Sequence, residues 1–152
     1  QIGWFGPNAL ANAESAEFLK QVVKLRWQLR RYFHAGEMAR PPKRDGTIPT
    51  VRADWKWDNP GWVTTDAAMT GAWLLPGGRR CVLLLTNVGD QPVTAQLKLD
   101  AAAYGLGGKQ VQVTTLTAAG QGETFKTAPA IDRSLTLPPR SAVAWELTPV
   151  EP

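Results

Sequence analysis

The sequence is short of the residues that build disulfides and zinc sites, since it contains one cysteine and one histidine in 152 residues. A single cysteine, Cys81, excludes an internal disulfide, and its place in an apolar segment predicts a buried, unreactive thiol. One cysteine and one histidine, His34, argue against a zinc site built by the protein, and we expect no cofactor. The longest unbroken apolar run, Cys81–Leu85, is far too short to span a bilayer, so no membrane partner is expected. These features leave the cellular compartment open.

Excess positive charge is confined to the first part of the chain. The net charge is +4, and residues 1–46 hold eight basic and four acidic side chains, whereas the remainder holds nine of each. A nucleic-acid partner would therefore depend on the basic helix of this region alone, and a charge run usually marks a solvated face. The rest of the chain lacks the basic groove with interleaved aromatics that is typical of single-strand binding proteins, so no nucleic-acid partner is expected.

One long amphipathic helix is predicted at Ala13–Ala35. Asn8 or Asn12 can cap its start, and Gly36 ends it. Its apolar side chains recur at spacings of three and four residues, namely Phe18, Val22, Leu25, Leu29 and Phe33, with Leu19 and Tyr32 at the border of the stripe. A single helix cannot bury such a stripe by itself, so we expect it to dock on another body. We interpret that body as one that this chain does not contain in full.

After Thr47 the pattern changes to short strands separated by turns. Apolar and alternating segments predict strands at 50–57, 63–75, 79–88, 93–99, 110–116, 123–126, 133–137 and 141–147. The 63–75 segment is either one long strand or a bent pair, and 79–88 is expected at the centre of a sheet. Turn signals at regular spacing, without strand–helix alternation, predict a mainly β fold. It is an antiparallel β-sandwich of about 7–8 strands preceded by one long amphipathic α-helix.

Several further residues have structural predictions. Trp73 and Trp145 lie inside predicted strands and are expected in the core. Asn87 and Asp90 flank a glycine and are interpreted as turn formers. His34 falls in the last helical turn, where a cation suits the negative end of the helix dipole.

Three segments carry a resemblance. They are Phe18–Pro42 (FLKQVVKLRWQLRRYFHAGEMARPP), Cys81–Asp100 (CVLLLTNVGDQPVTAQLKLD) and Leu137–Leu147 (LPPRSAVAWEL). The first resembles the final helix and tail of a (β/α)8-barrel in glycoside hydrolase-like proteins. The other two are similar to a hairpin and the closing strand of the C-terminal β-sandwich that follows such a barrel.

This resemblance implies a division of the chain. Residues 1–46 would be the final loop and helix of a barrel domain, and residues 47–152 the C-terminal β-sandwich domain. The seven preceding barrel units are absent, and the sequence opens at Gln1 without an initiator methionine. We therefore expect the chain to be the tail of a larger protein, and its partner to be the N-terminal catalytic barrel of that protein.

No catalytic residue is assigned within this chain. Glycoside cleavage needs two carboxyl groups, roughly 5–5.5 Å apart for retention or 6.5–9.5 Å for inversion. Asp54 and Asp58 form the best local pair, but on one extended strand they would lie about 13 Å apart at roughly 3.3 Å per residue. We interpret them as surface acids. The resemblance implies that the catalytic carboxylates lie on the missing barrel.

Four tryptophans are candidates for contact with carbohydrate. By the resemblance, Trp4 lies in the loop after the eighth barrel strand, where it either lines the sugar pocket or has a structural role, plugging the barrel mouth or anchoring the helix. Trp55, Trp57 and Trp62 form the tightest aromatic cluster. Their rings either stack on sugars or serve packing and interfaces, and the second role is favoured.

Two functions are consistent with these observations. The leading one is a non-catalytic C-terminal β-sandwich region of a carbohydrate-active, glycoside hydrolase-like enzyme, which braces the catalytic barrel. The alternative is a stand-alone β-sandwich module that binds carbohydrate or a surface. The alternative predicts that Trp55, Trp57 and Trp62 are exposed together on one flat face.

Overall fold

The computed structural model describes residues 12–56, 60–77, 79–108 and 110–150. Two helices come first, α1 (Ala13–Gln28) and α2 (Arg30–Ala35). A short 3-10 helix, η1 (Ala101–Tyr104), follows the seventh strand. The strands within the described residues are β1 (Glu37–Ala39), β2 (Lys43–Asp45), β3 (Thr50–Lys56), β4 (Pro60–Asp66), β5 (Ala68–Leu75), β6 (Arg80–Asn87), β7 (Val93–Asp100), β8 (Val111–Thr117), β9 (Gly120–Thr127), β10 (Ala130–Leu137) and β11 (Ser141–Pro149).

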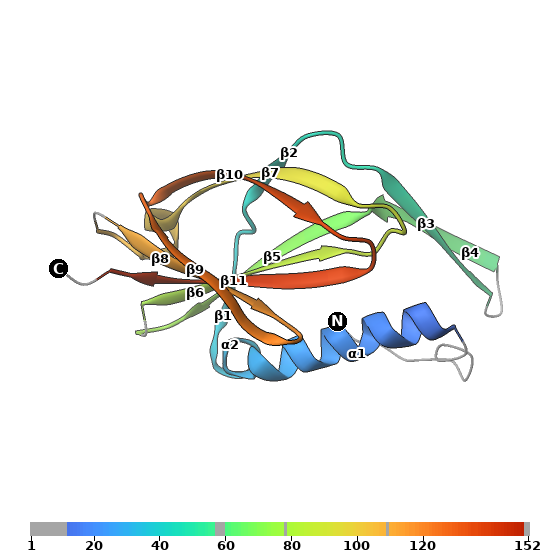
Figure 1. Ribbon diagram of the computed structural model, residues 1–152, viewed down its shortest axis with the longest axis horizontal. Helices are drawn as coiled ribbons and strands as arrows, with labels where there is room; N and C mark the ends of the chain where they lie inside the picture. Colours follow the sequence, from blue (N-terminus) through green and yellow to red (C-terminus); the bar gives the residue numbers. More distant parts are fainter. Residues whose placement is uncertain (1–11, 57–59, 78, 109, 151–152) are drawn as a thin grey trace.

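The strands form an antiparallel sandwich with a projecting hairpin (Figure 1). A six-stranded sheet has the order β1-β5-β6-β11-β8-β9, and a three-stranded sheet has the order β10-β7-β2. The hairpin β3-β4 is a separate two-stranded sheet that extends beyond the sandwich. The predicted fold class is confirmed, and β6 occupies the interior position that its continuous apolar run predicted.

The structure has more strands than predicted, for two reasons. The 63–75 segment is a bent pair, because β4 ends at Asp66 and β5 begins at Ala68 in a different sheet. The polar stretch before Thr47 also contains β1, which pairs with β5, and β2, which pairs with β7. Such three-residue strands are held by backbone hydrogen bonds and are too short to show an alternating apolar pattern in the sequence. The domain division between residues 46 and 47 stays a prediction.

The main core lies between the two larger sheets. Cys81, Leu83 and Leu85 of β6 are fully buried there, together with Val93 and Leu97 of β7. The closing strand contributes Trp145, which is 3% exposed and meets the expectation of a core residue. Because side chains alternate across a strand, the residues between these positions lie on the outer face of the six-stranded sheet.

A second apolar cluster holds the helices on that outer face. Leu25, Leu29 and Tyr32 are fully buried against Val82 of β6 and Ala144 of β11. The centre of the predicted helical stripe therefore docks on the chain's own sheet. The expectation that it lies against a body outside the chain is wrong for these residues, because the outer face of β6 and β11 is itself apolar and needs the same cover.

The helix begins and ends for local reasons. The Asn12 side chain accepts a hydrogen bond from the Ser15 backbone N–H at 2.9 Å, so Asn12, one of the two predicted candidates, is the N-cap. The predicted single helix is divided at Leu29, whose ψ of 6° leaves the helical range. At the far end, a Cβ on Gly36 would lie 2.3 Å from the Tyr32 carbonyl oxygen and 2.7 Å from that of Leu74. Only glycine lets the chain pass from α2 into β1 at this closeness.

Candidate docking surface on the helix

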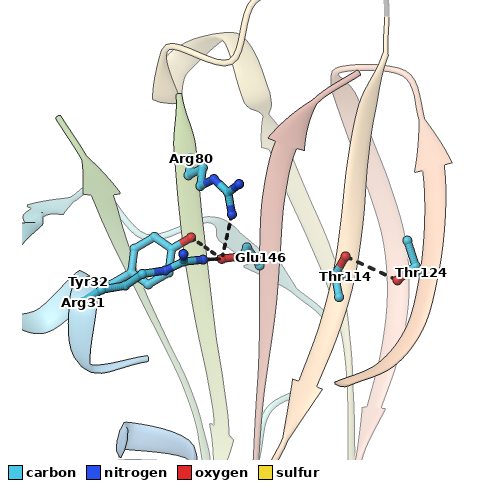
Figure 2. A network of polar contacts seen from close by, with 6 residues as sticks. All are labelled: Arg31, Tyr32, Arg80, Thr114, Thr124 and Glu146. Atoms are coloured by element: carbon cyan, nitrogen blue, oxygen red, sulfur yellow. Dashed lines mark hydrogen bonds and ion pairs between the residues drawn. The ribbon is translucent and has the colours of Figure 1, made fainter. Parts of the chain in front are cut away.

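A polar cluster around Glu146 ties the end of the helical region to the closing strand (Figure 2). The Tyr32 hydroxyl donates a hydrogen bond to Oε1 of Glu146 at 2.5 Å, and the Arg31 guanidinium pairs with the same oxygen. Arg80 of β6 approaches from the other side, with its Nη1 3.9 Å from Oε1. The Glu146 side chain is only 16% exposed, so these donors replace most of its water.

The electrostatics of this cluster favour its present protonation states. Burial raises the pKa of the Tyr32 hydroxyl well above its usual range, and the hydrogen bond to Glu146 raises it further. Burial opposes the charge on Arg31, but the neighbouring Glu146 carboxylate holds the pKa of Arg31 above its usual value. A carboxylate held by two cations and a phenol is an anchor for the helix rather than half of an acid–base pair.

The residues in register with Glu146 on β8 and β9 are polar but uncharged. Glu146 is directly opposite Thr114 of β8, and Thr114 is opposite Thr124 of β9. The Thr124 hydroxyl donates to the Thr114 hydroxyl at 3.3 Å, as Figure 2 shows. The polar row on the outer face therefore consists of Glu146, held by Tyr32 and Arg31, and a hydroxyl pair between β8 and β9.

The side of α1 that faces away from the sheet exposes large apolar side chains. Trp27 is 68% exposed and Val23 is 47% exposed. These two positions are four residues apart and hence neighbours on one helical face. The Arg30 guanidinium lies 4.9 Å from the centroid of the Trp27 ring, and Arg26 lies 5.2 Å from that of Phe33. The helix is thus apolar on two sides, of which its own sheet covers one.

An apolar groove extends this surface onto the sheet. It has a volume of about 350 Å³ and lies between the flank of α1 and the outer face of β5 and β6. Its lining includes Val22, Phe33, Met38, Trp73 and Leu84. Met38 is opposite Trp73 in the β1–β5 ladder and is 79% exposed. Trp73, which we expected in the core, is half-buried here and packs edge-on against Phe33, with their ring centroids 4.8 Å apart.

The projecting hairpin carries part of the predicted tryptophan cluster. Trp62 of β4 is 61% exposed, and the Arg52 guanidinium lies 4.7 Å from its ring centroid. In the ladder, Trp62 is opposite Asp54 and Trp55 is opposite Gly61. Positions 55 and 62 thus belong to neighbouring residue pairs of the ladder. Neighbouring pairs alternate between the two faces of a sheet, so these two positions belong to opposite faces of the hairpin. The platform of three tryptophans stays a prediction.

Some candidate residues lie outside the described part of the chain. They are Trp4, Trp57 and Asp58. The roles predicted for them therefore stay predictions. The best local carboxylate pair likewise stays an interpretation, because only the backbone of Asp54 is described.

The remaining sequence candidates have structural surroundings. Cys81 is a free, fully buried thiol, as predicted, and burial raises its pKa to about 12. His34 is exposed in the last turn of α2. Asn87 does more than form a turn, because its fully buried amide donates to the carbonyl oxygens of Gln91, Leu137 and Pro138 at 2.8, 3.2 and 3.0 Å.

Two functional features were missed at the level of sequence. Glu146 and Met38 were not singled out, although an acidic residue inside an apolar closing strand is a usable signal for a buried polar anchor. Within the described residues, no three or more His, Cys, Asp or Glu side chains gather into a group able to hold a metal ion. No helix in the described ranges is both long and apolar enough to cross a lipid bilayer.

The chain was also compared with known proteins. No protein-family model matches it, and no curated protein sequence matches it. Among solved structures, it is similar to the GH51 α-L-arabinofuranosidase of Thermotoga petrophila, with 16% identity and a TM-score of 0.44 over 69% of this chain and 24% of that one. It is also similar to a GH27 β-L-arabinopyranosidase of Geobacillus stearothermophilus, with 10% identity and a TM-score of 0.41 over 56% of this chain and 18% of that one.

A third similar structure is the family 44 xyloglucanase of Paenibacillus polymyxa, with 18% identity and a TM-score of 0.37 over 59% of this chain and 18% of that one. The match spans between 18% and 24% of the three solved chains. All three are glycoside hydrolases, the class of enzyme that the sequence resembles.

Proposed function

We propose that this chain is the C-terminal β-sandwich region of a carbohydrate-active, glycoside hydrolase-like enzyme, and that it braces the catalytic barrel without taking part in the chemistry. The observation that carries the proposal is the two-sided helix α1. Leu25 and Leu29 are fully buried on its own sheet, whereas Val23 and Trp27 are exposed on the other side. A helix with two apolar sides is suited to lie between two bodies, and the second body here is the barrel whose last helix α1 resembles.

The residues present support this division of labour. Glycoside cleavage requires a pair of carboxyl groups at a defined separation. The carboxylate of Glu146 is mostly buried, and it already accepts a hydrogen bond from Tyr32 and pairs with Arg31. In this proposal the catalytic carboxylates belong to the barrel, and Trp4, which precedes α1 in the sequence, lines the sugar pocket, plugs the barrel mouth or anchors the helix. The Glu146 anchor then fixes α2, and with it the end of α1, on the sandwich so that the two domains keep one relative orientation.

The test begins with the natural gene. The coding sequence upstream of Gln1 should contain repeated βα units, and the complete product should hydrolyse aryl glycosides. The 152-residue chain alone should leave the same substrates intact. Acidic residues at the ends of barrel strands would then be replaced one at a time by their amides, with Glu146→Gln as the matched control in the sandwich. Loss of hydrolysis in Glu146→Gln at unchanged folding, or an upstream sequence without βα units, would contradict the proposal.

A second candidate function is supported by one observation. Trp62 is 61% exposed on a hairpin that projects from the sandwich, as a sugar-stacking residue of a binding module would be. The chain alone should then be retarded in affinity gels that contain soluble polysaccharide. Trp62→Ala should abolish the retardation, whereas Trp27→Ala, a change at an equally exposed tryptophan, should preserve it. Equal migration with and without a panel of polysaccharides would remove this candidate.

A further inference from the structure

One pair of neighbouring residues in this chain is chemically labile. In the 152-residue sequence, Asp45 is the single aspartate or asparagine that is followed by a glycine, Gly46. Glycine has no Cβ, so its backbone nitrogen can approach the side-chain carboxyl group of the preceding residue with little steric hindrance. When that carboxyl group is protonated, the approach leads to ring closure, which is much slower before residues with larger side chains.

The structure places this pair in an accessible turn. Asp45 ends β2, which lies at the edge of the three-stranded sheet, and its side chain is 54% exposed. Gly46 follows with a φ of 112°, in a region that residues with a Cβ rarely adopt. The turn that leaves β2 thus requires glycine at the position that makes the preceding aspartate reactive.

A lysine on the neighbouring strand holds the Asp45 carboxylate. The Nζ atom of Lys98, on β7, lies 2.8 Å from Oδ2 of Asp45. The hydrogen bond and the charge of Lys98 lower the pKa of Asp45, and Lys43 on the same strand lowers it further. Asp45 in turn raises the pKa of Lys98, and Asp132 of β10 adds to this effect. The carboxylate is therefore kept ionised, and in that form it cannot release an oxygen atom as water.

We propose that Asp45 is a site of spontaneous isomerisation to isoaspartate and that Lys98 slows this reaction in the folded chain. In the first step the Gly46 nitrogen bonds to Cγ of the protonated Asp45, the bond from Cγ to its hydroxyl oxygen breaks, and the amide proton leaves with that hydroxyl group as water. Water then adds to either carbonyl group of the succinimide ring. Opening at the main-chain carbonyl gives isoaspartate, and opening at the other restores aspartate, so the water lost in the first step is regained.

Isomerisation would change the connection to the projecting hairpin. In isoaspartate the main chain passes through Cβ and Cγ, so an extra carbon atom enters the backbone just before Gly46. The preceding residue, Arg44, holds the base of the hairpin. Its Nη2 lies 3.0 Å from Oδ2 of Asp66, and its Nη1 donates a hydrogen bond to the Ala68 carbonyl oxygen. The extra atom would therefore displace the segment that joins this contact to β3.

The test follows isoaspartate formation in the 152-residue chain during prolonged incubation at neutral pH. Mass spectrometry with electron-transfer fragmentation locates the product, and enzymatic methylation of isoaspartate measures its amount. In the folded wild type the product should form slowly at Asp45, whereas Asp90, which is also exposed but precedes Gln91, should stay unmodified. Lys98→Met should raise the rate at Asp45 several-fold, and Lys98→Arg, which keeps the positive charge, should leave the rate low.

Controls separate the ion pair from the fold. Lys126→Met removes an exposed lysine from β9, in the other sheet, and should not change the rate at Asp45. Circular dichroism checks that each variant is folded. In urea, where the ion pair is lost, the wild type and Lys98→Met should form isoaspartate at the same rate. Asp45→Glu should form none at this position, because the corresponding imide ring would have six members and closes far more slowly.

Two results would overturn the proposal. If isoaspartate forms at Asp45 in the urea-unfolded chain but not in folded Lys98→Met, the fold itself prevents ring closure and Lys98 has no protective role. If the folded wild type and Lys98→Met form it equally fast, the ion pair does not control the reaction. Neither result bears on the function proposed above, since this inference is drawn from β2, β7 and the turn between β2 and β3.

Discussion

The hydroxyl of Tyr32 and the carboxylate of Glu146 lie 2.5 Å apart, and their hydrogen bond joins two elements that are separated by 114 residues in the sequence. Tyr32 is fully buried at the end of the helical region, and Glu146 lies on the outer face of β11. The contact holds α2 on the sheet at the same point where Leu29 and Ala144 close the second apolar cluster. Polar and apolar contacts therefore fix the helix together.

Replacing Tyr32 by phenylalanine tests this anchor. The variant keeps the ring but leaves the Glu146 carboxylate with one donor fewer in a mostly buried position. A hydrogen bond to a charged group contributes about 2 kcal/mol, so the free energy of unfolding should fall by that amount in urea titrations. Tyr104→Phe is the control, since the Tyr104 hydroxyl donates to a neutral carbonyl oxygen, that of Arg40, and should cost about 1 kcal/mol or less. Equal losses in both variants would contradict the special role of Glu146.

The two sides of α1 should differ sharply in their effect on stability. Leu29 is 1% exposed against the sheet, so Leu29→Ala should lower the free energy of unfolding by about 3 kcal/mol through lost burial and a cavity. Trp27→Ala, at a side chain that is 68% exposed, should change it by less than about 0.5 kcal/mol. Urea denaturation of the 152-residue chain measures both. A large loss in Trp27→Ala would mean that the outward face is already covered within this chain.

Local sequence signals predicted the elements well, because each depends on neighbours a few residues away. The Asn12 cap, the period of the helical stripe and the continuous apolar run of β6 are local patterns with direct physical causes. The cover of the helix was not predicted, since a stripe at Leu25 and Leu29 looks the same whether it meets a missing domain or the chain's own sheet. That distinction depends on where β6 and β11 lie in space.

The parts that escaped prediction are contacts between distant residues. Asn87 was interpreted as a turn former, and its Oδ1 does accept a hydrogen bond from the Gly89 backbone N–H at 2.9 Å. Its amide, however, also binds carbonyl oxygens of Leu137 and Pro138 on the connection to β11, fifty residues further along the chain. The role of Glu146 was not predicted for the same reason. The donors that stabilise its carboxylate, Tyr32 and Arg31, are more than a hundred residues away in the sequence.

Asn87 should be among the most sensitive polar positions of the sandwich. Asn87→Ala removes the donor for three carbonyl groups and the acceptor for the Gly89 N–H, all at a fully buried site. Unsatisfied buried polar groups cost about 1–3 kcal/mol each, so a loss of about 3 kcal/mol is expected in thermal or urea unfolding. Asp90→Ala is the control, because Asp90 is exposed in the same turn and should change stability by less than about 0.5 kcal/mol. Similar small effects at both positions would show that the amide network is dispensable.

The buried thiol of Cys81 predicts a specific loss of stability at alkaline pH. Burial raises its pKa from 9.0 to about 12, so the folded protein keeps the thiol proton in a range where the unfolded chain releases it. The stability from this group is fully present below pH 9 and is lost as the pH rises toward 12, because the unfolded state then binds fewer protons than the folded state. Between pH 9 and 10 this group alone should lower the free energy of unfolding by about 1 kcal/mol. Burial also raises the pKa values of Tyr32 and Tyr104, so part of the fall should remain in Cys81→Ala. In urea titrations at fixed ionic strength the fall in Cys81→Ala should be smaller by about 1 kcal/mol over the same interval, and an equal fall in both proteins would show that the thiol does not contribute to the loss of stability.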